Sequence, residues 1–407
     1  MKKVIYVGYD LEEGRSPHQA MAAIWMALNG HFVYYFTTSV KPVPSWARKI
    51  SSLKFVSFSS NSRALAGCKL GFALFFRLLK GEVDIVYVQG AQQSVLTFWV
   101  PLVFKKIEII YHTQDFKPDI YWLYNSTEKI LARRSDLVIC NEINRAKVMQ
   151  VARNLRRTPE VIRTSLPSKW PAMRRRSSVR SEIMANAVSA GCSVDVDTVL
   201  FIAAGGPYFS RRKSDRLMAA LLELEEKYVL VFTGMDANST RRRECIDEAE
   251  LLGVSERVVV MSRLNYSRLL EVYSACDLGM LLYSDTDLAN FYQGPGRLTE
   301  YLRSGLPIVS SDFPGLELVV LKYGIGAVAD SDSPMEISAA IKKILMHDGQ
   351  YPKERLIDIA RYDICYERDA GRVLSKFFSL SDDYYDHPLW SFLESEYARD
   401  DGGSTYG

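Results

Sequence analysis

A glycine-rich turn followed by a cation and a carboxylate stands out in the second half of the chain. Residues 294–315 read GPGRLTEYLRSGLPIVSSDFPG. Gly294 and Gly296 permit the backbone to approach a ligand closely, and the helix predicted to begin there presents free N–H groups to an anion. Arg297 can hold phosphate oxygens with its planar fork, and Glu300 can accept hydrogen bonds from two neighbouring hydroxyls, as on a ribose. The spacing predicts a nucleotide diphosphate site; the plain alternative is a strand-to-helix turn with a surface glutamate.

A second basic segment follows the apolar run at 199–203. Residues 203–213 read AAGGPYFSRRK, so that Gly206 is followed by the cations Arg211 and Lys213. Positive groups held at this place would stabilise an anionic leaving group as its bond breaks. The alternative is the solvated start of a basic helix.

Two further segments with polar side chains follow strand-like runs in the first half of the chain. IIYHTQDF, residues 109–116, places His112 at a strand end, where a neutral imidazole can hydrogen-bond a sugar hydroxyl or brace the surrounding structure. Asp115 is a weaker candidate for contacts with an acceptor. The loop 10–16 follows the first strand and contains Gly14 and Arg15, which can meet a phosphate or an acceptor, or can belong to an ordinary surface loop.

The elements that must position these residues alternate between short apolar runs and longer amphipathic ones. This pattern is typical of βαβ units with parallel sheets. Strands are predicted at 4–9, 32–36, 55–58, 84–88, 107–112, 137–140, 199–203, 229–232, 258–261, 278–282 and 308–310. Doubly wound sheets of this kind bind ligands beyond the carboxyl ends of their strands.

The pattern is interrupted once, which divides the chain. Residues 171–195 contain prolines, serines and three consecutive arginines, and we expect a linker there. The predicted organisation is therefore a Rossmann-like lobe at 1–170, a second Rossmann-like lobe at 196–350, and a C-terminal helical segment and tail at 351–407 that can pack back on the first lobe.

The charge is divided unevenly between the two halves. Up to residue 180 there are 28 Lys and Arg against 12 Asp and Glu, and after it 23 against 36. A basic first lobe suits an anionic membrane or a phosphate-bearing acceptor, although mutual attraction of two opposite lobes is an alternative. Apolar stretches at 70–79 and 95–104 are too short to span a bilayer; they suit the core, or an interfacial face.

The six cysteines are scattered, with no CxxC pair and no His at metal-ligand spacing, so we expect a reducing compartment and no zinc site. The first strand begins too early to leave room for a signal peptide. We therefore expect a cytoplasmic protein, peripheral on the inner face of the membrane.

The block at 294–315 resembles the donor-binding segment of the family-4-type retaining glycosyltransferases, which have the two-lobed GT-B architecture. The segment 319–341 is also similar to that family, and the resemblance covers about 195–350 well. It implies that Glu300 binds the nucleotide of a UDP- or GDP-sugar donor, with Gly294, Gly296, Arg297 and Gly206 around the diphosphate. It also implies that Lys213 serves the diphosphate, together with Arg211 or Arg212, and that His112 faces the donor sugar.

One position departs from the family pattern. Many members carry a second glutamate eight residues before the one that matches Glu300, and this chain has Tyr292 there. The donor sugar, and to a lesser degree the retaining outcome, are left open by this change. Asp285 and Asp287 form a D-x-D pattern that holds Mn²⁺ in single-lobed transferases, but it falls after a second-lobe strand. We read it as a polar loop and expect no metal or other cofactor.

The resemblance implies transfer of a sugar from a nucleotide-sugar donor to an acceptor held near Gly14, Arg15 and His112. The basic first lobe favours a lipid-linked or membrane-presented saccharide acceptor in polysaccharide biosynthesis, and nucleic acid is not an expected partner. Two alternatives remain. A nucleotide-sugar 2-epimerase shares the fold but needs no acceptor, and an inactive binding subunit of a polysaccharide machine would fit the Tyr292 departure.

Overall fold

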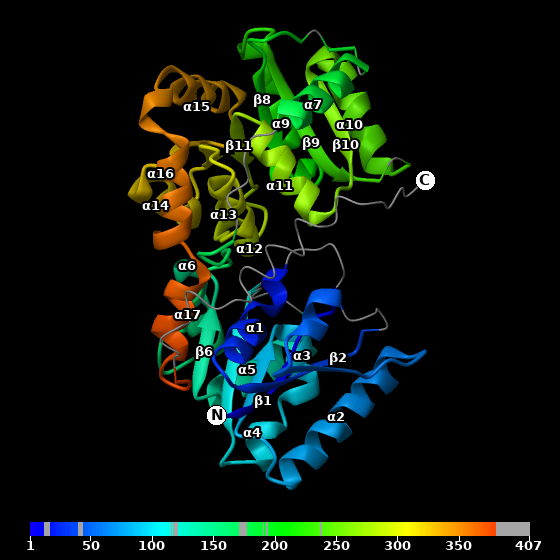
Figure 1. The fold of residues 1–407 in the computed structure, drawn as a ribbon, viewed down its shortest axis with the longest axis vertical. Helices are drawn as coiled ribbons and strands as arrows, with labels where there is room; N and C mark the ends of the chain where they lie inside the picture. The colour runs from blue at the N-terminus through cyan, green and yellow to red at the C-terminus, as the bar shows by residue number, and fades with distance from the viewer. Residues whose placement is uncertain are drawn as a thin grey trace. The chain divides into compact units, whose positions relative to one another are not determined.

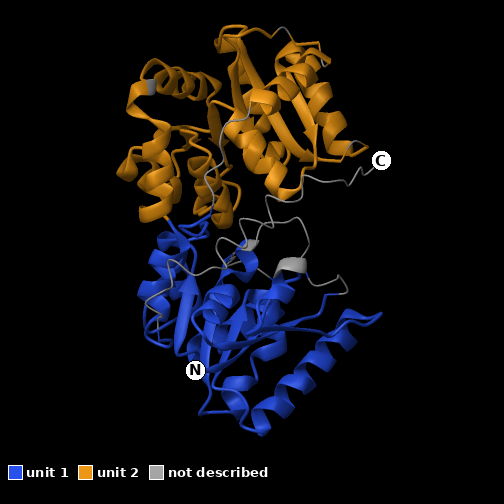
Figure 2. Ribbon diagram, viewed as in Figure 1, with its two compact units in different colours: residues 1–170, 365–407 blue, residues 171–364 orange. Residues whose placement is uncertain are grey.

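The computed structural model describes residues 1–11, 17–39, 44–114, 116, 121–170, 177–189, 191–192, 194–236 and 238–379. The chain divides into two compact units (Figure 2). Unit 1 consists of Met1–Trp170 and Cys365–Gly407, and unit 2 of Pro171–Ile364. Each unit is built around one parallel sheet with helices on its faces (Figure 1).

The helices and strands of unit 1 are β1 (Lys3–Val7), α1 (Met21–Leu28), β2 (Phe32–Thr37), β3 (Leu53–Ser57), α2 (Arg63–Leu79), β4 (Ile85–Gln89), α3 (Ala91–Thr97), α4 (Val100–Val103), β5 (Glu108–Thr113), α5 (Trp122–Arg134), β6 (Leu137–Cys140), α6 (Ile143–Arg153), β7 (Glu160–Val161) and α17 (Tyr366–Leu374). Those of unit 2 are α7 (Ser177–Ser189), β8 (Val199–Ala203), α8 (Phe209–Arg212), α9 (Ser214–Ala219), β9 (Tyr228–Met235), α10 (Thr240–Leu251), β10 (Val258–Ser262), α11 (Tyr266–Ala275), β11 (Leu278–Leu281), α12 (Leu288–Phe291), α13 (Gly296–Arg303), β12 (Ile308–Ser311), α14 (Pro314–Tyr323), β13 (Gly326–Ala329), α15 (Pro334–Met346) and α16 (Lys353–Asp358).

Both sheets are doubly wound. The strand order is β3-β2-β1-β4-β5-β6-β7 in unit 1 and β10-β9-β8-β11-β12-β13 in unit 2, and all strand pairs are parallel. The order reverses beside the first strand of each sheet, between β1 and β4 and between β8 and β11. The prediction of two Rossmann-like lobes is confirmed, and the reversal points are where such sheets bind ligands.

Burial on both faces of the sheets explains why the strands read as continuous apolar runs. All of β4 is buried, as are four of the five residues of β1. One face of the first sheet carries stacked rings in register: Tyr6 lies opposite Tyr35 and Tyr87, with centroids 4.9 and 4.7 Å away. Phe55 stacks on Tyr35 at 4.8 Å, which extends the row to β3. This aromatic row fixes the register across four strands.

The linker prediction for 171–195 needs correction, because residues 177–189 form helix α7 and belong to unit 2. Only three positions of α7, spaced by four, are buried: Val179, Ile183 and Ala187. A stripe this narrow leaves a weak pattern in the sequence. Two short strands, β7 and β13, were also not predicted.

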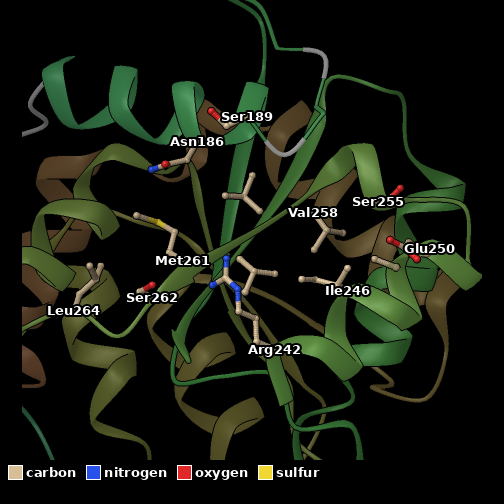
Figure 3. Close-up of a pocket in the computed structure, with 13 residues that line it drawn as sticks. Asn186, Ser189, Arg242, Ile246, Glu250, Ser255, Val258, Met261, Ser262 and Leu264 are labelled. Carbon is tan, nitrogen blue, oxygen red and sulfur yellow. The ribbon is translucent and has the colours of Figure 1, made fainter. Parts of the chain in front are cut away.

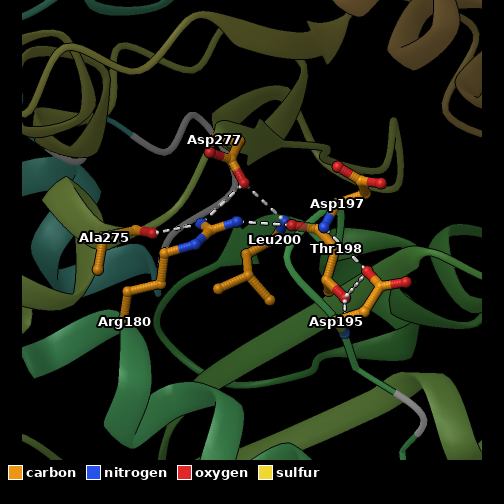
Figure 4. Close-up of polar contacts among 7 residues, drawn as sticks. All are labelled: Arg180, Asp195, Asp197, Thr198, Leu200, Ala275 and Asp277. Carbon is orange, nitrogen blue, oxygen red and sulfur yellow. Dashed lines mark hydrogen bonds and ion pairs between the residues drawn. The ribbon is translucent and has the colours of Figure 1, made fainter. Parts of the chain in front are cut away.

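Helix α7 is attached to the sheet of unit 2 by one arginine (Figure 4). Arg180 donates through Nη1 to the Ala275 carbonyl at 2.8 Å and to Asp277 Oδ2 at 2.9 Å, and through Nη2 to the Thr198 carbonyl at 2.5 Å. The same Asp277 oxygen accepts the backbone N–H of Leu200 at 2.9 Å. Because these groups adjoin the starts of β8 and β11, the arginine joins α7 to the amino edge of the sheet.

The C-terminal segment predicted at 351–407 is divided between the units. Helix α16 lies in unit 2, whereas α17 packs in unit 1. Arg163 donates to both carboxylate oxygens of Asp369, at 2.7 and 2.9 Å, and the Ser168 N–H donates to Glu367 at 2.8 Å. Forked arginine–carboxylate pairs of this kind are strong, so α17 is fastened to unit 1. Residues 380–407 lie outside the described part.

Within the described ranges, no helix combines the length and the apolar character needed to cross a membrane.

Candidate donor site

The loop after β8 is built from glycines with left-handed backbone. Gly205 and Gly206 have φ of +88° and +83°, and Gly234 in the neighbouring β9 has φ of +97°. The Gly206 N–H donates to the Thr233 carbonyl at 2.6 Å, which holds the loop against β9. A Cβ on Gly234 would lie 3.1 Å from Gly206 N. Glycine adopts such left-handed backbone without strain, so the loop requires the two glycines at 205–206. The close approach of the loop to β9 requires the glycine at 234 as well.

Two guanidinium groups converge on the carbonyl that precedes this loop. Arg212, at the end of α8, donates to the Ala204 carbonyl at 3.0 Å and to the Gly205 carbonyl at 2.5 Å. Arg297, in the first turn of α13, donates to the same Ala204 oxygen and, through Nη2, to Tyr283 Oη at 2.6 Å. Both arginines are partly buried. Two segments far apart in the sequence, one with Arg212 and the other with Arg297, thus place two positive charges at the reversal point of the second sheet.

These two cations have no carboxylate in direct contact. In the described part of the chain, neither guanidinium forms an ion pair with a carboxylate. Burial, and then the charge of Arg297, lower the pKa of Arg212 to about 10, so it remains positive at neutral pH. Glu300, one turn along α13, acts on Arg297 through its charge but forms no direct ion pair with it. Two neighbouring cations without a directly paired carboxylate favour an anion beside them.

Glu300 lies on α13 one turn after Arg297. It is 5% exposed, so it is not the surface glutamate of the plain alternative. Its Oε1 accepts a hydrogen bond from Tyr266 Oη, at 3.1 Å, in the first turn of α11. A carboxylate offers about four acceptor positions, and the tyrosine occupies one of them.

Tyr301, next to Glu300, makes hydrogen bonds with the end of β8 and the start of the glycine loop. Its Oη accepts the Ala204 N–H at 3.1 Å and donates to the Ile202 carbonyl at 3.3 Å. Its ring occupies the space in which a Cβ on Gly279 would lie, only 2.5 Å from the ring carbon Cδ2. The absence of a side chain at Gly279 in β11 therefore leaves room for the Tyr301 ring, whose hydroxyl reaches the loop. Sequence reasoning missed Tyr266, Tyr283 and Tyr301, because a buried aromatic residue is most often an ordinary core residue.

The structure separates the basic residues predicted after the glycines. Arg211 is exposed, and its backbone makes two hydrogen bonds: its N–H donates to the Tyr208 carbonyl at 3.3 Å, and its carbonyl accepts the Ser284 N–H at 3.0 Å. Lys213 pairs with Asp332 at 2.5 Å instead of turning to the loop. Arg212 is therefore the residue of this segment that contacts the glycine loop, which favours it over Arg211 as the substitute expected from the family pattern.

The turn before α13 has the predicted form. Pro295 is the N-cap residue, and Gly296 is the first residue of the helix. Gly294 and Gly296 are both partly buried and have ordinary backbone angles, so their role rests on the lack of a side chain and not on left-handed geometry. Tyr292 is partly buried and its ring meets that of Phe291 edge to face at 4.9 Å.

In unit 1, His112 is the penultimate residue of β5 and is 2% exposed. Its Nδ1 lies 2.7 Å from Tyr87 Oη, so it adjoins the aromatic row of the sheet. Burial lowers its pKa to about 3, which keeps the ring neutral. Nε2 is buried and makes no hydrogen bond with the described residues. The contact with Tyr87 fits the bracing alternative, and the contact with a sugar hydroxyl stays a prediction.

Gly14, Arg15 and Asp115 lie outside the described residues.

The D-x-D pattern at 285–287 has a local structural role. Asp287 is the N-cap of α12, where its Oδ1 accepts the Asn290 N–H at 2.7 Å, and Thr286 lies 2.8 Å from Ser284 Oγ. Among the described residues, no three His, Cys, Asp or Glu side chains gather in a way that could hold a metal ion.

A cavity of about 690 Å³ in unit 2 lies elsewhere, along the edge strand β10 between α7 and α10 (Figure 3). Its lining includes Asn186, Arg242, Val260 and Met261, and none of the residues around the glycine loop. The sequence did not predict it. We place the donor site at the glycine loop, because the charges and the sheet topology coincide there.

Residues 200–361 match the family model described as glycosyl transferases group 1.

Solved structures resemble most of the chain. The HepE protein of Anabaena in complex with UDP superposes with a TM-score of 0.68 at 15% identity, over 92% of this chain and 99% of that one. Sucrose-phosphate synthase from Thermosynechococcus elongatus superposes with a TM-score of 0.69 at 13% identity, over 92% of this chain and 99% of that one. The lipopolysaccharide outer core galactosyltransferase WaaB in its apo form superposes with a TM-score of 0.66 at 13% identity, over 92% of this chain and 99% of that one. No curated protein sequence matches the chain.

These comparisons confirm the GT-B fold for the chain, and a glycosyltransferase group 1 match for the segment that contains the glycine loop, Arg297 and Glu300. The narrower assignment to family 4 stays a prediction.

Proposed function

We propose that the protein transfers a sugar from a nucleotide diphosphate sugar to an acceptor, with unit 2 as the donor-binding unit. The observation that carries the proposal is the pair of guanidinium groups of Arg212 and Arg297 on the glycine loop, without carboxylate partners. A nucleoside diphosphate gains negative charge as the sugar leaves, and fixed cations with the α13 N-terminus stabilise that charge.

The donor is a UDP- or GDP-sugar in this proposal. Glu300 accepts hydrogen bonds from the ribose hydroxyls, and the Anabaena HepE structures with UDP and with UDP-glucose support the uridine nucleotide. The reaction retains the anomeric configuration, as the resemblance to the retaining family implies. It needs no metal, because side-chain cations and helix N–H groups neutralise the diphosphate. His112 Nε2 contacts a sugar hydroxyl, while Lys213 and Arg211 contribute positive charge around the site.

The acceptor is a lipid-linked or membrane-presented saccharide, bound by unit 1 near Gly14, Arg15 and Asp115, in polysaccharide biosynthesis. The excess of basic residues before position 180 supports an anionic surface as the place of work. The similarity to a lipopolysaccharide galactosyltransferase is consistent with such an acceptor. The protein acts in the cytoplasm, peripheral on the inner face of the membrane.

A thermal-shift series with UDP, GDP, ADP and their sugars, followed by slow hydrolysis of the best donor, tests the proposal. We expect stabilisation by one diphosphate and its sugars, and release of free sugar without an acceptor. Isomerisation of the donor sugar would instead identify a 2-epimerase. Donor binding without any hydrolysis or transfer would identify an inactive subunit, and no binding by any nucleotide would refute the donor site.

A further inference from the structure

Helix α2 of unit 1 carries apolar side chains on two opposite sides. One line, at intervals of four residues, is buried: Ala66, Leu70, Leu74 and Leu78. A second line follows the spacing of one helix face and is 52–65% exposed: Leu65, Phe72, Phe76 and Leu79. A helix at the surface of a soluble unit normally carries polar residues on its outer face. Within the apolar stretch at 70–79, the buried leucines therefore serve the core, whereas Phe72, Phe76 and Leu79 are available to a partner.

The exposed apolar area continues onto the neighbouring segment. The ring of Phe75 lies 5.9 Å from that of Trp99 and 5.8 Å from that of Phe104, so α2 and α4 are side by side. Leu102 and Val103, on α4, are 42% and 58% exposed. Figure 1 shows α2 and α4 near each other in unit 1. Two elements thus contribute to one apolar area.

Lysines surround this area and acidic residues are absent from it. Lys69 lies four positions after Leu65, and Lys80 four positions after Phe76, so each shares the outer face of α2. Lys105 and Lys106 follow α4 directly, and all four lysines are exposed. No Asp or Glu occurs at 63–80 or 98–106. We call these residues the α2 surface: Leu65, Lys69, Phe72, Phe76, Leu79, Lys80, Leu102, Val103, Lys105 and Lys106.

We infer that the α2 surface docks on an anionic lipid bilayer. Apolar side chains enter the boundary between headgroups and acyl chains, and the lysines remain at the level of the anionic headgroups. A second copy of the chain fits less well, because a two-fold contact would bring lysines together without any carboxylate on this surface to pair with them. An anionic bilayer satisfies both the apolar and the charged groups.

The inference rests on the proposed function in one respect, since docking brings the transferase to a membrane-presented acceptor. It differs from a general attraction of a basic lobe, because it assigns attachment to particular side chains. Lysine charge supplies the long-range attraction, and Phe72 and Phe76 supply the insertion that salt does not screen.

The test is flotation of the full chain with vesicles of phosphatidylcholine alone, or with one third phosphatidylglycerol. We expect binding to the anionic vesicles and little to the neutral ones. The double variants Phe72→Ser/Phe76→Ser and Lys69→Glu/Lys80→Glu should each lower the partition coefficient at least about tenfold. The matched controls are Leu251→Ser/Met346→Ser, at two side chains 80% exposed in unit 2, and Lys342→Glu/Lys343→Glu, at exposed lysines of α15. Both should bind like the wild type.

Binding of UDP, followed by thermal shift on the same samples, reports the donor site and the fold separately. Equal UDP stabilisation in all variants with lost vesicle binding in the two α2 variants supports the inference. Wild-type-like vesicle binding by the α2 variants, or no binding by the wild type at low salt, overturns it. So does a dimer in sedimentation experiments that the Phe72→Ser/Phe76→Ser variant dissociates, because a second copy would then be the occupant.

Discussion

The phenol of Tyr266 donates a hydrogen bond to the Glu300 carboxylate across 3.1 Å, from the first turn of α11 to the middle of α13. The tyrosine engages one oxygen and orients the group. We expect Glu300→Ala to weaken UDP binding by one to two orders of magnitude, because hydrogen bonds to a charged group each contribute about 1.5–3 kcal/mol. Tyr266→Phe, which leaves the carboxylate in place, should change affinity by less than about threefold. Isothermal titration measures both, and unchanged affinity of the alanine variant would remove Glu300 from the site.

Arg212 and Arg211 provide a second comparison. They are adjacent in sequence, but the Arg212 side chain contacts the glycine loop and the Arg211 side chain is exposed. Arg212→Ala removes the cation that lies on the glycine loop and should lower UDP affinity at least about tenfold. Arg211→Ala, at an exposed side chain, should have a smaller effect. The measurement is titration with UDP and with uridine, since only the diphosphate should discriminate the variants. A larger loss from Arg211→Ala would return the role to the residue first predicted.

His112 predicts a pH dependence of stability. Its folded pKa, about 3, lies below the ordinary value of 6.5, because burial disfavours the imidazolium. Between these two values the unfolded chain binds a proton that the folded chain does not, so stability falls as the pH drops below about 6.5, by about 1.4 kcal/mol per pH unit at most.

Urea unfolding of the wild type and His112→Asn at pH values from neutral to mildly acidic measures this dependence. The difference in unfolding free energy between the two should shrink as the pH falls, because the variant lacks the titrating group. A difference independent of pH would show that the ring is accessible to protons in the folded state.

Gly279 and Gly71 form a pair of glycines with opposite expectations. A Cβ on Gly279 would lie 2.5 Å from the Tyr301 ring, whereas one on Gly71, in helix α2, has nothing within 4 Å. Gly279→Ala should lower the free energy of unfolding by about 1–3 kcal/mol through overpacking. Gly71→Ala should raise it by up to about 1 kcal/mol, since alanine is the better helix former. Chemical denaturation measures both, and a neutral Gly279→Ala would mean that Tyr301 can move.

The last prediction concerns metal. Donor hydrolysis should continue in excess EDTA, because Arg212, Arg297 and the α13 N-terminus provide the positive charge. Asp285→Asn should preserve UDP affinity, whereas Asp287→Ala should lower stability by about 1 kcal/mol through loss of the α12 N-cap. If EDTA abolished hydrolysis and Mn²⁺ restored it, Asp285 and Asp287 would become candidate ligands.

The sequence by itself predicted most strands of both sheets, with small differences at their ends, because strands buried on both faces leave continuous apolar runs. It also located the block with Gly294, Arg297 and Glu300, since a turn and the first turn of a helix are close in space whenever they are close in sequence. The short edge strands β7 and β13 escaped prediction, because two to four residues carry too little pattern.

The tertiary structure alone decided which side chains meet across separate segments. Lys213 has a left-handed φ of +48°, which separates α8 from α9. Arg212 therefore turns to the glycine loop and Lys213 to Asp332, although the two are neighbours in the sequence. Arg297 reaches the same loop because β8 and β11 are adjacent in the sheet. The direction of a side chain depends on backbone angles and strand neighbours, and neither is recorded in the types of the residues.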